Sequence, residues 1–143
     1  MGPFLRVRSA KFTIMPGEDD DLVNEGMYGK SLAIYLQQEL TKQGYEVPFY
    51  CCEDWGWWVE LKGYPYTFGV CIYGQKLESG ELDLYVTDGA VSNRVWSWRK
   101  FRFLDISETV AKLHHDLVII FRNDPEVRLL ATDLDSPFLD DQP

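Results

Sequence analysis

The chain is poor in the residues that build metal sites and reactive centres. It has two histidines and three cysteines among 143 residues, and Cys51, Cys52 and Cys71 show no C-x-x-C spacing. His114 and His115 are adjacent on a predicted helix, where successive side chains point in different directions and cannot easily bind one metal ion. No nucleophile elbow, phosphate-binding loop or H-E-x-x-H motif is present. The sequence therefore predicts no catalytic residue, no metal site and no cofactor.

The chain also lacks a long apolar segment. One of the longest, residues 117–121, is far shorter than the roughly 20 residues that span a bilayer. The N-terminus shows no basic segment followed by an apolar one, so no secretory signal is visible. An odd number of cysteines fits free thiols in a reducing compartment. We expect a cytoplasmic protein without a membrane partner.

Positive charge is scarce as well. The chain has 14 Lys and Arg against 23 Asp and Glu, a formal net charge of −9. This balance argues against nucleic acid and anionic membranes as partners and favours a basic or neutral one, although such a charge can also serve solubility alone. One segment, residues 94–103, interleaves the cations Arg94, Arg99, Lys100 and Arg102 with aromatics. Such mixing can bind single-stranded nucleic acid by stacking, but it is also typical of a half-exposed strand, which we favour.

The first half of the chain predicts a strand, an acidic loop and a helix. Alternating apolar residues indicate a strand over residues 4–14, and the four carboxylates at 18–21 lack the spacing of a calcium loop. A helix is expected over residues 24–43, with Asn24 as its N-cap. Its core stripe contains Gly29, Leu32, Ala33, Leu36 and Leu40. Ile34 lies on the opposite side with Met27 and Gln38. It is either ordinary surface scatter, which we favour, or part of a homodimer or partner face.

The second half predicts a meander of strands and a second helix. Strands are expected over residues 45–52, 57–62, 67–73 and 81–87, and their short connections favour antiparallel neighbours. Asp105 and Glu108 have the spacing of a capping box, so a helix is predicted from Asp105 to the Asn123-Asp124-Pro125 stop. Residues 126–134 indicate an edge strand. The predicted fold is α+β, with two helices on one face of a mainly antiparallel five- to six-stranded sheet in one domain (1–134), followed by a flexible acidic tail (135–143).

Residues 53–58 hold three indoles and two carboxylates in six positions. Tryptophan buries a large rigid area and keeps one N–H donor, so it anchors interfaces well. Strand alternation places Trp58 on the wet face of the sheet, while Trp55 and Trp57 fit either core or interface. The predicted partner-binding set is Glu53, Asp54, Trp55, Trp58, Glu60, Tyr73, Asp83 and Tyr85.

Residues 29–61 resemble a group of short bacterial proteins of uncharacterised function. The resemblance rests on Gly44-Tyr45-Glu46-Val47 followed by Glu53-Asp54-Trp55-Gly56-Trp57, in which an amphipathic helix leads into a Trp-containing strand. It implies a bacterial, cytoplasmic setting in which small acidic proteins serve as toxin-neutralising immunity proteins or other inhibitors. We therefore expect a protein-binding module that occludes a basic toxin or enzyme. The alternatives are a small-ligand binder on the aromatic open face and a hydrolase with an unrecognised carboxylate site.

Overall fold

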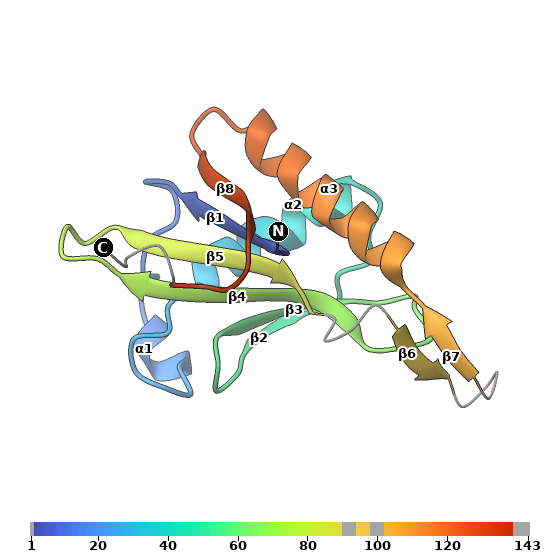
Figure 1. Cartoon of the computed structure of the whole chain (residues 1–143). Helices are drawn as coiled ribbons and strands as arrows, with labels where there is room; N and C mark the ends of the chain where they lie inside the picture. Colours follow the sequence, from blue (N-terminus) through green and yellow to red (C-terminus); the bar gives the residue numbers. More distant parts are fainter. Residues whose placement is uncertain (1, 90–93, 98–101, 139–143) are drawn as a thin grey trace.

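The computed structural model describes residues 2–89, 94–97 and 102–138 (Figure 1). Its elements are, in chain order, β1 (Phe4–Arg8), α1 (Glu18–Asp21), α2 (Lys30–Lys42), β2 (Tyr50–Cys52), β3 (Trp57–Leu61), β4 (Phe68–Lys76), β5 (Leu82–Asp88), β6 (Arg94–Ser97), β7 (Arg102–Asp105), α3 (Ser107–Asn123) and β8 (Arg128–Leu134). No helix in these ranges has the length and apolar character that crossing a membrane requires.

Six strands form one sheet in the order β2-β3-β4-β5-β1-β8, and every neighbouring pair is antiparallel. The predicted α+β fold is confirmed, with β8 at the sheet edge as expected. The segment 94–103 is predicted to be one strand, but its described parts, β6 and β7, pair with each other as a separate two-stranded antiparallel sheet. Arg99 and Lys100, from its predicted basic cluster, lie outside the described residues.

The two long helices cover one face of this sheet. The predicted stripe of α2 is buried, and Leu36 has no exposed surface. Leu113, Leu117 and Phe121 of α3 belong to the same core cluster. The sheet side of this core is Leu5, Val7, Trp57, Val59, Leu61, Phe68, Val70, Ile72, Leu82, Leu84 and Val86. The apolar parity of β3, β4 and β5 therefore faces the helices, as the alternation predicts.

Two predicted strands are shorter than expected. The first ends at Arg8, because a turn begins at Ser9, whose hydroxyl donates to the Glu126 carbonyl at 2.7 Å. The second begins only at Tyr50, because Pro48 has no N–H to donate to a ladder. Upstream of it only the isolated bridge between Glu46 and Lys62 remains.

The predicted acidic loop is a one-turn helix, and its first residue positions α2. Glu18 is fully buried and accepts the backbone N–H groups of Met15, Gly29 and Lys30 at 2.9, 2.9 and 3.1 Å. A carboxylate on the free N–H groups of a helix start satisfies both hydrogen bonding and the helix dipole. The helix therefore begins at Lys30, and the prediction of Asn24 as N-cap is wrong.

The second long helix also begins later than predicted. Strand β7 continues through Asp105, and α3 starts at Ser107, whose backbone N–H donates to the Asp105 carboxylate at 2.9 Å. Its end at Asn123 is as expected.

Beyond β8, the Phe138 ring packs against Tyr85 at a centroid distance of 5.0 Å. The first part of the predicted tail thus contacts the sheet, while residues 139–143 lie outside the described ranges.

Candidate functional site

The side of the sheet away from α2 and α3 is called here the open face. Strand pairing places Cys51 opposite Trp58, Trp58 opposite Cys71, and Cys71 opposite Thr87, so these four residues form one row across four strands. They share the parity that points away from the core. The tryptophan motif therefore lies at the β2–β3 side of this face.

A tight hairpin turn positions Trp55. The backbone N–H of Glu53 donates to the Gly56 carbonyl at 2.7 Å, and the Asn24 amide donates to the Asp54 carbonyl at 2.5 Å. A Cβ on Gly56 would lie 2.2 Å from the Ile72 carbonyl oxygen, so the turn needs glycine. From this turn the Trp55 ring contacts the rings of Trp58 and Tyr73.

The neighbouring tryptophans have separate roles, which the sequence left open for Trp55 and Trp57. Trp57 is 2% exposed in the core, and its indole N–H donates to the Met27 carbonyl at 2.9 Å. Trp58 is half-buried on the open face. Its indole N–H donates to the Glu60 carboxylate at 2.7 Å.

Two glycines without side chains leave the space that the Trp58 ring occupies. A Cβ on Gly69 would lie 2.6 Å from the indole ring, and a Cβ on Gly89 would lie 2.3 Å from it. The ring therefore packs directly on the backbone of the neighbouring strands. Glycine within a strand indicates such close approach of another group. Gly69 could therefore have indicated from the sequence that a ring packs on this strand.

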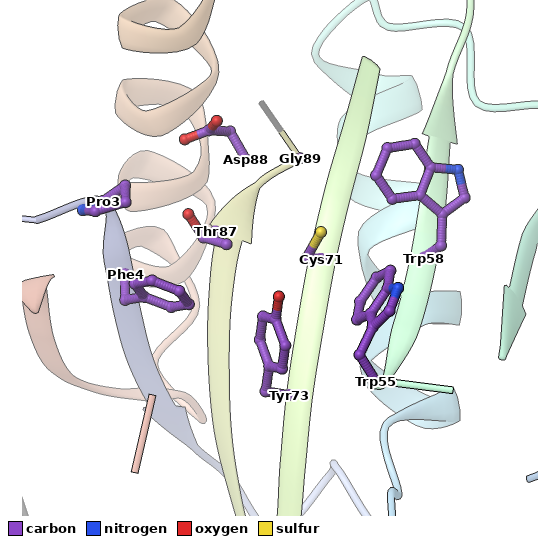
Figure 2. A pocket seen from close by; sticks show the side chains of 9 residues that line it. All are labelled: Pro3, Phe4, Trp55, Trp58, Cys71, Tyr73, Thr87, Asp88 and Gly89. Carbon is purple, nitrogen blue, oxygen red and sulfur yellow. The ribbon is translucent and has the colours of Figure 1, made fainter. Parts of the chain in front are cut away.

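The open face is hollowed beside these rings by a cleft of about 360 Å³, called here the aromatic cleft. Figure 2 shows Trp55 and Trp58 along one side and Phe4 along the other, with Tyr73 between them. Cys71, Thr87 and Asp88 also line it, together with Pro3 and Gly89. The cleft thus unites the predicted Trp55, Trp58 and Tyr73 with residues that the sequence did not single out, Phe4 among them.

The polar groups of the cleft differ in charge. Burial raises the pKa of the Cys71 thiol to about 12 and that of the Tyr73 phenol to about 12, so both are neutral near pH 7. Within the described part of the chain, the buried hydroxyl of Thr87 has no hydrogen-bond partner. Asp88, the one charged residue among the described lining residues, pairs with Val70 and therefore has the parity of the core face.

Two members of the predicted binding set lie on the open face but have no exposed surface. Asp83 accepts from Arg6 at 2.8 Å and from Arg8 at 3.0 Å. Tyr85 lies under the Phe138 ring, with the Arg6 guanidinium 5.3 Å from its ring centroid. In this conformation neither side chain can contact a partner, which corrects the expectation that both are accessible.

The remaining predicted residues are carboxylates around the tryptophans. Glu53 and Asp54 are exposed at the hairpin turn, and Glu60 is half-buried beside Trp58. The Glu53 carboxylate accepts from the Cys51 thiol at 3.4 Å, and burial raises the pKa of that thiol to about 11. Both side chains are exposed, whereas the two carboxylates of a catalytic pair lie together in a shielded site. They fit a charged rim better than a hydrolytic centre.

No cluster of metal ligands lies elsewhere in the described ranges, where no three His, Cys, Asp or Glu side chains converge. His114 makes a hydrogen bond with the Thr132 carbonyl at 2.7 Å, which ties α3 to β8.

Comparison of the chain with family models, curated proteins and solved structures finds no match. The site is therefore interpreted from its own geometry, and the resemblance to small bacterial proteins stays a prediction.

Proposed function

We propose that this protein is a binding module that engages a basic protein partner through the open face of its sheet and occludes it, as an inhibitor or immunity protein does. One observation carries the proposal: Trp55, Trp58 and Tyr73 gather, half-buried, on one patch of a protein of net charge −9. A monomeric core would bury such rings more completely, as it does Trp57. Clustered, partly exposed aromatics are typical of interface hot spots.

The charges around the patch complement a basic surface. Glu53 and Asp54 are exposed beside Trp55, and Glu60 is hydrogen-bonded to Trp58. Negative charge at the rim steers a cationic partner, while the aromatic centre supplies most of the binding free energy. Free thiols at Cys51, Cys52 and Cys71 agree with the cytoplasmic location that belongs to this proposal.

Matched variants on the two sides of the sheet test the proposal. Trp58→Ala removes a ring of the patch on β3, whereas Leu130→Ala removes an apolar side chain that is 46% exposed on the distant edge strand β8. Proteins captured from the natural host by the wild type would be identified by mass spectrometry and the purified partner titrated calorimetrically. We expect Trp58→Ala to weaken binding by at least about 2 kcal/mol and Leu130→Ala to leave it unchanged.

The same preparation tests occlusion. If the partner is a toxin or an enzyme, its activity should fall to zero when one equivalent of the wild-type protein is added, and Trp58→Ala should shift that titration to higher concentrations. Equal affinity of the Trp58→Ala and wild-type proteins, with circular dichroism showing both folded, would contradict the proposed surface.

A small-ligand binder is the second candidate, and the aromatic cleft favours it. Its volume of about 360 Å³ lies within the range of small-molecule sites, about 300 to 1,000 Å³. Native mass spectrometry of the protein purified from its host distinguishes the two. A retained compound of low mass that is lost in Trp58→Ala supports the second candidate, and a captured basic protein supports the first.

A further inference from the structure

The aromatic cleft offers a chain of four ring faces. The Trp55 and Trp58 rings are 6.5 Å apart and perpendicular, at 89°. Trp55 is 5.4 Å from Tyr73, and Tyr73 is 5.8 Å from Phe4. Rings in these tilted orientations cannot all stack on one flat ligand, but their faces can surround a compact group.

Such a group is best positively charged. The face of an aromatic ring carries the negative part of its quadrupole and attracts a cation, most strongly for tryptophan. The Trp58 indole donates its N–H to the Glu60 carboxylate at 2.7 Å, which draws positive charge to that edge and makes the ring face more negative. A cation above Trp58 is therefore favoured both by the ring and by the carboxylate at its N–H edge.

One hydrogen-bond acceptor lies in the same cleft, in the open-face row that contains Trp58 and Cys71. It is Thr87, 6% exposed, whose hydroxyl has no hydrogen-bond partner in the described part of the chain. A cation that bears N–H groups can use this acceptor, whereas a quaternary ammonium has no N–H to donate.

We infer that the aromatic cleft binds the primary ammonium group of a lysine side chain presented by the partner. The lysine stem is apolar and fits against the rings while its head meets the Thr87 hydroxyl. Lysine is a compact point charge, and the wider planar guanidinium of arginine suits paired acceptors in a fork instead. The inference rests on the proposed function for the source of the lysine, but the chemistry of the cleft can be tested without the partner.

The experiment titrates the full chain with small probes and follows the five indole N–H signals by NMR, assigned with single Trp→Phe variants. The probes are Nα-acetyl-lysine methylamide, the norleucine analogue of similar length without the charge, and choline as a free quaternary ammonium. Sodium chloride at matched ionic strength controls for screening. We expect the lysine probe to shift the Trp55 and Trp58 signals saturably and to bind at least about tenfold more tightly than the norleucine probe.

Variants locate the binding. Trp58→Ala should abolish the shift at Trp55, Thr87→Val should weaken the lysine probe at least about fivefold, and Leu130→Ala should change nothing. Equal affinity for lysine and norleucine would overturn the inference, because the cleft would then be merely apolar. Tighter binding of choline than of lysine would overturn it in favour of a quaternary ligand, and so would the absence of any saturable shift in the wild type.

The two proposals fail separately. If the lysine probe does not bind but Trp58→Ala still loses the captured partner, the proposed function stands and the lysine inference falls. If the lysine probe binds but Trp58→Ala captures its partner with unchanged affinity, the cleft is cation-specific and is not the partner-binding surface.

Discussion

The two ends of the open face differ in how far they are covered. At one end, Arg6 and Arg8 both bond to the buried Asp83, and Tyr85 is fully covered. At the other end, Trp55 and Trp58 stay half-buried around the aromatic cleft, which Phe4 also lines. Here the first is called the closed end and the second the open end.

The boundary between them falls between two paired tyrosines. Tyr73 and Tyr85 are direct cross-strand partners, of the same residue type and on the same face. Tyr85 is buried because Arg6 and Phe138 cover it, whereas Tyr73 remains half-buried. Contacts from β1 and the C-terminal segment, and not strand parity, therefore decide which part of this face is free to bind.

The largest effect is expected from removing the carboxylate of the closed end. Asp83→Ala leaves two guanidinium groups, only 12% and 22% exposed, without their shared partner. Loss of one member of a buried ion pair destabilises by about 3 to 5 kcal/mol, and we expect a loss of this order in urea denaturation.

A triple variant controls for this interpretation. Arg6→Met, Arg8→Met and Asp83→Leu together replace the charges by apolar side chains, which should recover most of the lost stability. If Asp83→Ala is as stable as the wild type, the closed end is not held by its ion pairs.

Acid should open the closed end with a smaller effect, because it removes the charge of Asp83 and not the side chain. Burial by itself raises the pKa of Asp83, but the hydrogen bonds from Arg6 and Arg8 outweigh burial and lower it below 3.8. A lowered folded-state pKa contributes stability that is present above the unfolded value and is lost as pH falls through the folded value. Between about pH 5 and pH 2 the stability of the wild type should therefore fall more steeply than that of Asp83→Asn. Parallel curves would contradict this.

Local pattern predicted the buried face well. The alternation of Leu82, Leu84 and Val86 and the helical stripe around Leu36 each follow from backbone geometry, so their burial could be read from the sequence. The start of α2 could not, because its cap, Glu18, is 11 residues upstream of Gly29, beyond any local capping motif.

The candidate site was predictable only in part, for the same reason. Trp58 and Tyr73 have the parity of the open face, and that placed them correctly. Asp83 and Tyr85 have the same parity, but Arg6 is 77 residues from Asp83 in the chain, and Phe138 comes from beyond the last strand. Pairings over such separations leave no local sequence signal.

The open end should tolerate a large truncation with a moderate loss. Trp58→Ala removes a half-buried ring, so we expect a loss of about 1 to 2 kcal/mol in chemical denaturation, against about 3 to 5 kcal/mol for Trp57→Ala in the core. The adjacent positions carry the same residue type, which makes them matched controls. Equal losses would mean that Trp58 is a structural residue first and would weaken its role as an anchor.

The smallest effect is expected where Phe138 covers Tyr85. The two rings are 5.0 Å apart at 72°, and such an edge-on pair contributes about 0.5 to 1.5 kcal/mol beyond its buried area. Phe138 also has a φ of +63°, a left-handed conformation that glycine adopts without strain, so Phe138→Gly should lose less stability than Phe138→Ala. Chemical nitration with mass spectrometry gives a second readout. The wild type should be nitrated at the half-buried Tyr73 and protected at Tyr85, whereas both variants should gain nitration at Tyr85. Protection of Tyr85 in both variants would show that Arg6 alone closes this end of the face.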